Sequence, residues 1–216
     1  LSGGTLTANG TISLANFNMA GGTINGTHTL NGALSWTAGT LNNTGNTTIG
    51  AAGVLTVSST NDHDMNQHVV INDGAINWTG GRIRGGTGAT LTNNAAFNDT
   101  ASNVVNDDYG GAAFVFTNAA NGTYHKLAAG TTRFDTTFNN QGLVNIDAGT
   151  LQFNGGGTLA AAGILAADAG TTVNFSNSYT IADASKLTGA GSYQISGGTV
   201  SLSGSVAASN LLITGG

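Results

Sequence analysis

The densest group of polar side chains in this sequence is NDHDMNQH, residues 61–68. Imidazole and carboxylate groups bind transition metals, and carboxylate and amide oxygens bind calcium. The alternation of a β-strand would place Asp62, Asp64 and His68 on one side and His63 on the other. One strand by itself supplies three converging ligands poorly. A solvated loop or sheet edge is therefore the favoured interpretation, a metal site at Asp62, Asp64 and His68 is the alternative, and no cofactor is expected.

A second group of polar residues, NVVNDDYGG, contains the neighbouring carboxylates Asp107 and Asp108. Paired carboxylates are the groups that cleave glycosidic bonds. Adjacent residues on a strand point to opposite faces, so these two cannot form the pair by themselves. Candidates for the missing partner are Asp99, Asp135 and Asp147. An exposed loop is the favoured interpretation, and a catalytic group drawn from Asp99, Asp107, Asp108 and Asp135 is the alternative.

The composition identifies the elements that must position these groups. The chain has 216 residues with 35 Gly, no Pro, no Cys and 7% charged residues. Residues that favour surface helices are nearly absent, whereas β-branched Thr, Val and Ile are common, which predicts an all-β protein. The formal net charge is -5 and the five basic residues are scattered apart from the pair Arg82 and Arg84, which argues against nucleic-acid binding. No apolar run approaches the length of a membrane span.

An internal repeat determines the predicted fold. The stretches FNMAGGTI, ALSWTAGTL, AINWTGGRI, LVNIDAGTL and SYQISGGTV share two apolar residues at alternate positions, then a glycine, then another apolar residue. Alternation with period two indicates a short strand with one buried face, and glycine suits a corner. Corner glycines recur after 18, 17 and 21 residues, from Gly4 to Gly22 to Gly39 and from Gly149 to Gly170. Repeats of this length predict a parallel β-solenoid, three-faced and right-handed.

The repeat also predicts which side chains stack in the interior. One inward column is expected to contain Phe17, Leu34, Ile76, Val144 and Tyr193, and its neighbour Met19, Trp36, Trp78, Ile146 and Ile195. At the corner, Thr5, Thr23 and Thr40 should stack beside Leu6, Ile24 and Leu41. Trp36 and Trp78 are accordingly interpreted as core residues rather than a sugar-binding platform. Tyr109, Tyr124 and Tyr179 lie outside these columns and are expected to be freer to face solvent, with Tyr109 and Tyr124 as candidate binding residues.

The organisation expected along the chain is one β-solenoid segment, 1–216, of a longer protein. The repeat is clear in 1–60 and 140–216 and blurred between them. Residues 92–128 are expected to form irregular or protruding coils, with 98–111 as the main excursion. Neither end shows the polar capping that a complete solenoid needs, which favours an excised piece.

The stretches GTLNNTGNTTIGAAGVLTV (39–57) and FNNQGLVNIDAGTLQFNGGGTLAAAGILAADAGTTVNF (138–175) resemble the repeats of large bacterial surface proteins. The family is that of filamentous-haemagglutinin-type adhesins and autotransporter passengers. The resemblance implies a right-handed β-solenoid that is secreted to the bacterial cell surface. It covers most of the chain and carries no catalytic residues over.

Three functional hypotheses follow. The favoured one is a non-enzymatic structural and adhesive segment, a stalk or passenger, whose partners are glycans or proteins of host or neighbouring cells, or the matrix. It predicts a segment that is not embedded in a membrane. The alternative is a polysaccharide-binding or polysaccharide-cleaving β-helix, either a lyase or hydrolase or a tailspike-like protein. The third is an ice-binding solenoid, although Thr-x-Thr at 5–7, 27–29 and 90–92 shows no constant offset and threonine at a corner ordinarily packs along the ladder.

Overall fold

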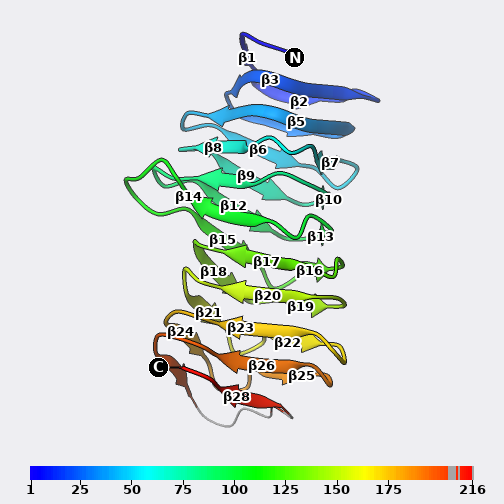
Figure 1. Ribbon diagram of the computed structural model, residues 1–216. Coiled ribbons are helices and arrows are strands. Elements are labelled where there is room, and N and C mark those ends of the chain that lie inside the picture. Colours follow the sequence, from blue (N-terminus) through cyan, green and yellow to red (C-terminus); the bar gives the residue numbers. More distant parts are fainter. Residues whose placement is uncertain (204–207, 209, 216) are drawn as a thin grey trace.

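The computed structural model describes residues 1–203, 208 and 210–215 and shows a parallel β-solenoid of ten turns. Within the described residues every regular element is a strand, and every pairing between strands is parallel. Figure 1 shows the turns stacked into a straight rod with the two ends of the chain at opposite ends. With a spacing of about 4.8 Å between strands, ten turns extend about 43 Å along the axis. The right-handed sense stays a prediction.

Three ladders of strands form three faces, and each turn of the chain visits face 1, face 2 and face 3 in that order. Face 1 contains the first halves of β3 (Phe17–Asn25) and β5 (Ala33–Asn42), then β7 (Val54–Val57), β10 (Ala75–Trp78), β13 (Ala96–Asp99), β16 (Thr123–Lys126), β19 (Leu143–Ile146), β22 (Ile164–Ala167) and β25 (Lys186–Thr188). Face 2 contains β1 (Thr5–Thr7), the second halves of β3 and β5, β8 (His63–Asn66), β11 (Ile83–Gly85), β14 (Val104–Asp107), β17 (Thr131–Phe134), β20 (Thr150–Phe153), β23 (Thr172–Phe175), β26 (Ser192–Ile195) and β28 (Leu211–Ile213). Face 3 contains β2 (Gly10–Ile12), β4 (His28–Leu30), β6 (Asn46–Ile49), β9 (Val69–Asn72), β12 (Thr90–Asn93), β15 (Val115–Asn118), β18 (Thr137–Asn140), β21 (Gly157–Leu159), β24 (Tyr179–Ile181) and β27 (Val200–Leu202).

The corner between faces 1 and 2 explains the repeated phrase. Thr5, Thr23 and Thr40 are successive partners, and beside them Leu6 pairs with Ile24 and Ile24 with Leu41, as predicted. Gly22 has a φ of 74°, and a Cβ on it would lie 2.6 Å from the carbonyl oxygen of Gly4. Both the left-handed backbone and the neighbouring turn therefore require glycine at this corner.

The inward columns of face 1 are confirmed for most of their predicted members. Phe17 pairs with Leu34, and the column continues through Ile76 to Val144; Met19 pairs with Trp36, and that column continues through Trp78 to Ile146. The prediction is wrong for Tyr193 and Ile195, which lie in β26 on face 2, where Tyr193 pairs with Val173. The reason is that an apolar-x-apolar pair before a glycine occurs at the corner after face 2 as well.

The middle of the rod has wider turns than the rest. Leu55, Ile76 and Phe97 are successive partners 21 positions apart, whereas Val105 pairs with Phe134, 29 positions later. β12 to β16 nevertheless remain in the three ladders. Much of the extra length between Val105 and Phe134 lies in the long connection 108–114 between β14 and β15, which Figure 1 shows as a loop beside β14.

Two interior features hold the turns together. Aromatic rings stack through the middle and later turns with centroid separations of 4.6–6.4 Å; they belong to Phe97, Phe116, Tyr124, Phe134, Phe138, Phe153, Phe175 and Tyr179. On face 3, buried asparagines form a ladder in which Asn72 donates to Asn93 at 2.7 Å, Asn93 to Asn118 at 2.8 Å and Asn118 to Asn140 at 2.8 Å. Because identical amides one turn apart hydrogen-bond to each other, these polar side chains are accommodated in the core.

Candidate functional site

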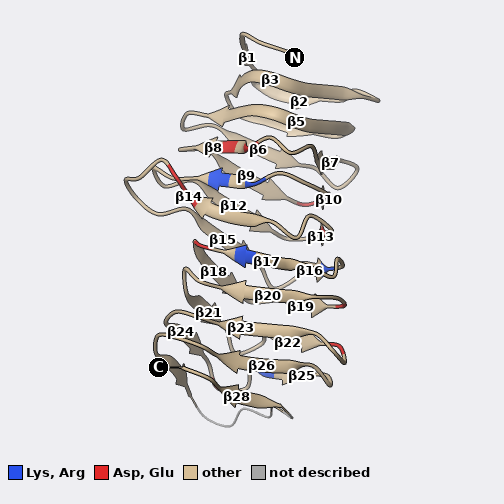
Figure 2. Cartoon of the chain, in the orientation of Figure 1, with Lys and Arg blue, Asp and Glu red and all other residues tan. Residues whose placement is uncertain are grey.

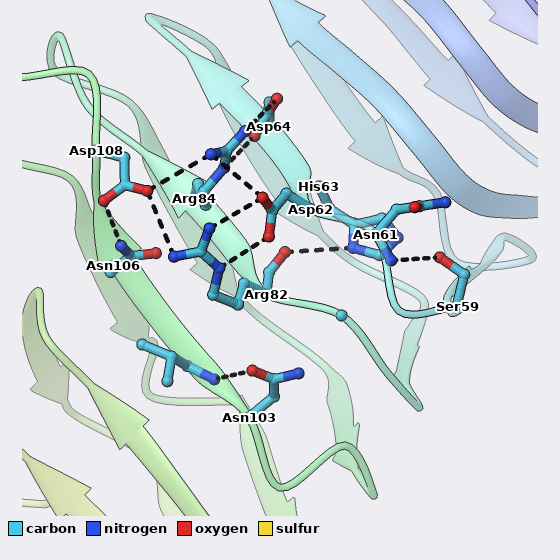
Figure 3. Close-up of polar contacts among 12 residues, drawn as sticks. Ser59, Asn61, Asp62, His63, Asp64, Arg82, Arg84, Asn103, Asn106 and Asp108 are labelled. Carbon is cyan, nitrogen blue, oxygen red and sulfur yellow. Dashed lines mark hydrogen bonds and ion pairs between the residues drawn. The ribbon is translucent and has the colours of Figure 1, made fainter.

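Five charged residues of the middle turns form one ionic cluster on the outside of face 2, defined here as Asp62, Asp64, Arg82, Arg84 and Asp108 (Figures 2 and 3). Arg82 donates through Nε and Nη2 to both oxygens of Asp62, at 2.8 and 2.9 Å. Arg84 does the same to Asp64, at 2.7 and 3.0 Å. Oδ2 of Asp108 lies 3.6 Å from Nη1 of each arginine.

Register explains why these side chains meet. Arg84 on β11 is the direct partner of Asp64 on β8, so the two point outward from the same position of successive turns. Asp62 precedes β8, and Asp108 follows β14 at the start of the loop 108–114. The hydrogen bond from Arg82 is the main cause that lowers the pKa of Asp62, and Asp64 likewise raises the pKa of Arg84. Each carboxylate of the ionic cluster thus faces a guanidinium, in the arrangement of charge-assisted hydrogen bonds.

Tyr109 extends this cluster toward solvent. Cζ of Arg84 lies 5.8 Å from the centre of its ring, a cation–π contact, and the side chain is 39% exposed. Partial burial and the neighbouring Asp64 raise the pKa of Tyr109 to about 12. The expectation that Tyr109 is freer to face solvent is thus confirmed. Tyr109 combines an accessible aromatic ring with adjacent charged groups, and it remains a candidate binding residue.

The predicted grouping of Asp62, Asp64 and His68 is wrong for the histidine. His63 does point inward, opposite Asp64, but His68 is also fully buried. Nδ1 of His68 lies 3.2 Å from the carbonyl oxygens of Asn42 and Asn43. A bend between β8 and β9 separates His68 from Asp64, so the strand alternation that the prediction assumed does not reach it. Among the described residues no group of three or more His, Asp, Glu or Cys side chains is arranged to hold a metal ion.

His68 instead belongs to a buried chain of polar side chains. Oγ1 of Thr47 lies 2.9 Å from Nε2 of His68 and 3.1 Å from Nε2 of His28. A hydroxyl can donate to one ring and accept from the other, so Thr47 can link the Nε2 atoms of both histidines when these are neutral, while the buried Nδ1 of His28 has no hydrogen-bond partner. Burial is the main cause that lowers the pKa of both histidines, and the charge of His68 lowers that of His28 further.

Asp99 lies in the interior rather than at a surface groove. It is fully buried, its Oδ2 accepts hydrogen bonds from Tyr124 Oη at 2.8 Å and from Thr132 Oγ1, and its Oδ1 accepts from the amide of Ala101 at 3.0 Å. Burial raises the pKa of Asp99 despite these hydrogen bonds. Its partner in the next turn is Lys126, also fully buried, whose pKa burial lowers.

The expectation that Tyr124 and Tyr179 face solvent is wrong. Both are buried, at 0% and 1% exposure, because Tyr124 is the partner of Phe97 in the inward column of face 1 and Tyr179 packs in the aromatic stack. Trp36 and Trp78 are buried at 2% and 0%, as predicted. The indole Nε1 of Trp78 donates to the carbonyl of Gly81 at 2.8 Å. Accessible aromatic groups for ligand stacking are thus scarce on this rod.

The other carboxylates that the sequence suggested as catalytic candidates each interact with a different partner. Oδ2 of Asp107 accepts from the amide of Phe114 at 3.1 Å, and Asp108 belongs to the ionic cluster. Asp135 is paired with Arg133 at 2.7 and 2.8 Å, and Oδ2 of Asp147 lies 3.3 Å from Nδ1 of His125. Two surface depressions near the N-terminal turns contain none of these side chains. Asp99, Asp107, Asp108 and Asp135 are therefore not brought together in a cleft.

Sequence reasoning missed the buried Lys126 and the pairing of Arg84 with Asp64. For Lys126, the available signal was a polar residue that interrupts an apolar column. For the ion pair, it was the spacing of 20 residues between Asp64 and Arg84, which places them at matching positions of successive turns. The described residues include no helix able to cross a bilayer. Comparison with protein-family models, with curated proteins and with solved structures finds no match for the chain.

Proposed function

We propose that this rod is a structural and adhesive segment, a stalk or passenger, of a larger bacterial protein that is secreted to the cell surface. The observation that carries the proposal is the stack of ten turns around one continuous apolar core. Such a rod separates its two ends by a fixed distance and presents long columns of outward side chains. The resemblance of its repeats to those of surface adhesins supports the same proposal.

The ionic cluster and Tyr109 are the part of the rod best suited to contact a partner. They stand beside the loop 108–114, and loops on a rigid scaffold commonly carry recognition. The partners proposed are glycans or proteins of host or neighbouring cells, or the matrix between cells. An aromatic ring next to paired charges fits a polar ligand that has one apolar face, such as a sugar ring.

Polysaccharide cleavage is the alternative, and the geometry of the carboxylates gives it no specific support. Cleavage by two carboxylates needs them on either side of one bond, within about 10 Å. Asp99 points into the core, Asp108 points outward among arginines, and Asp135 is bound to Arg133. We therefore do not propose an enzymatic function.

The proposal is tested by screening the purified rod against glycans, matrix proteins and bacterial and animal cells. Binding that falls at least tenfold in Tyr109→Ala and stays unchanged in Leu127→Ala, a second exposed apolar side chain, would support it. In parallel, polysaccharides are incubated with the rod and examined for new reducing ends or unsaturated sugars. Turnover that disappears in Asp135→Asn or Asp108→Asn would replace the adhesive proposal by an enzymatic one.

A further inference from the structure

The outer surface of face 3 consists of two columns of short, uncharged side chains. The central outward column contains Thr11, Thr29, Thr48, Ile71, Thr92, Thr117, Asn139, Thr158, Thr180 and Ser201, which are successive partners in the ladder. Two positions earlier on each strand lies a second outward column, in which Asn46, Val69, Thr90, Val115 and Thr137 are successive partners. We propose that face 3 binds the surface of ice through these two columns.

Two of the three Thr-x-Thr stretches, 27–29 and 90–92, share a register on face 3. Thr29 on β4 and Thr92 on β12 belong to the same column, and the stretch 90–92 contributes Thr90 to the second column. Three turns of 19, 23 and 21 residues separate Thr29 from Thr92. The stretch at 5–7 lies on face 2 and takes no part.

The side chains on face 3 are held in a fixed two-dimensional array. Residues two apart on a strand are separated by roughly 6.6 Å and strands by about 4.8 Å, so the columns form a regular grid. Threonine, valine and isoleucine have few χ1 rotamers, and the first six members of the central column, Thr11 to Thr117, are all β-branched. An array already ordered before binding loses little entropy when it meets a crystalline surface.

Two observations identify ordered water as the ligand. The hydroxyls of Thr29, Thr48, Thr92 and Thr117 make no hydrogen bond within the part of the chain that the structure describes, so they are free to bond water. The ten strands of face 3 contain no Asp, Lys or Arg, whereas the strands of face 2 carry outward charges such as those of Asp64, Arg84 and Arg133 (Figure 2). Charges would hold water in shells of their own geometry. Alternating methyl and hydroxyl groups at lattice-like intervals instead leave the first water layer free to adopt the arrangement of ice.

Other occupants fit face 3 less well. A crystalline glycan such as cellulose would need exposed aromatic platforms, and the aromatic residues on these strands, Phe116, Phe138 and Tyr179, point inward. A second copy of the chain would be expected to cover a more apolar surface, and threonine hydroxyls paired across such an interface would need partners. Ice supplies hydrogen-bonding oxygens at regular intervals in its surface planes and carries no net charge.

The test measures thermal hysteresis, the gap between melting and freezing temperatures, and the inhibition of ice recrystallisation by the purified rod. We expect both in the parent chain and a loss of most of the hysteresis in Thr92→Lys and in Thr117→Lys. Thr56→Lys, an equivalent outward threonine on β7 of face 1, is the control and should retain it. Circular dichroism melts of all variants establish that each remains folded.

Several outcomes would overturn the proposal. They are absence of hysteresis and recrystallisation inhibition in the folded parent, equal loss in Thr56→Lys, or a parent that is dimeric by light scattering and becomes monomeric in Thr92→Lys. Binding to cellulose or chitin that is lost in the face 3 variants, without any effect on ice, would also replace it. The proposal is independent of the adhesive function, because Tyr109 and the ionic cluster lie on face 2 and in its loop.

Discussion

Replacing Trp78 by alanine tests the core register of face 1 most directly. The indole is fully buried, its ring centre lies 6.4 Å from that of Phe97 in the next turn, and its Nε1 donates to Gly81 at 2.8 Å. Truncating a buried tryptophan costs about 3–5 kcal/mol because the cavity cannot fully collapse. Loss of the hydrogen bond to a buried carbonyl adds about 1 kcal/mol. Adding these two contributions, we expect Trp78→Ala to lower the free energy of unfolding by about 4–6 kcal/mol.

The measurement is urea denaturation followed by circular dichroism, with the fluorescence of Trp36 as a second probe. Solenoids can unfold turn by turn, so the two probes are compared before a single free energy is derived. Asn77→Ala is the matched control: Asn77 is the outward neighbour of Trp78 on β10 and only accepts a hydrogen bond from Asn98 at 2.9 Å. If Trp78→Ala unfolds at the same urea concentration as the parent, the inward register is wrong and the tryptophan must be reconsidered as a ligand platform.

Three further predictions concern the polar groups. Asn118→Leu should cost about 3 kcal/mol or more in urea denaturation, because it removes the acceptor of Asn93 and a donor to the carbonyl of Leu143 in a buried ladder; an unchanged midpoint would contradict the ladder. Burial lowers the pKa of His28 and His68 in the folded chain, so below the unfolded value near 6.5 the unfolded state binds more protons, and stability should fall as pH drops from 7.5 to 5.5. The fall should be shallower in His68→Gln, and an equal slope in both proteins would refute this assignment. Arg84→Ala should cost only about 1 kcal/mol, and less in 0.5 M salt, because its ion pairs lie at the surface; a loss several times larger, measured by the same denaturation, would show that the ionic cluster is structural.

Much of the fold could be predicted because a solenoid repeats the same local solution. The alternation in ALSWTAGTL and AINWTGGRI placed Leu34, Trp36, Ile76 and Trp78 inward, and the structure confirms each of them. The glycine corner was predictable since only one residue type fits both its φ and the backbone of the adjacent turn. The same pattern failed at Tyr193, where a similar phrase marks a different corner. A local sequence pattern identifies a strand followed by a bend, but it does not identify which of the three corners of the solenoid that bend forms.

The candidate site was less predictable because it depends on the lengths of turns. Partners on face 2 are 20 positions apart between Asp64 and Arg84 but 29 apart between Val105 and Phe134. No local signal gives these lengths, so neither the ionic cluster nor the threonine columns of face 3 could be aligned in advance. Asp99 and Lys126 were unpredictable for another reason, because charged residues at inward positions contradict the pattern. The hydrogen bonds that Asp99 accepts from Tyr124, Thr132 and the amide of Ala101 explain how its carboxylate is accommodated.

The separation of inward and outward positions has a consequence for how this rod can acquire function. Each strand commits its inward residues to the stack, and the outward residues of one face make few contacts with those of another, because the core lies between them. Substitutions outside the core therefore change one face while leaving the stability of the turns nearly intact. Face 2 has collected paired charges and an exposed tyrosine, whereas face 3 has remained free of charge over ten strands. Among Asp, Lys and Arg, the outward positions of the described face 1 strands carry only Lys186, so the absence of charge by itself does not distinguish face 3. What distinguishes face 3 is the outward column from Thr11 to Thr117, which is entirely β-branched, and the proposed binding to ice depends on the regularity of this array rather than on its lack of charge.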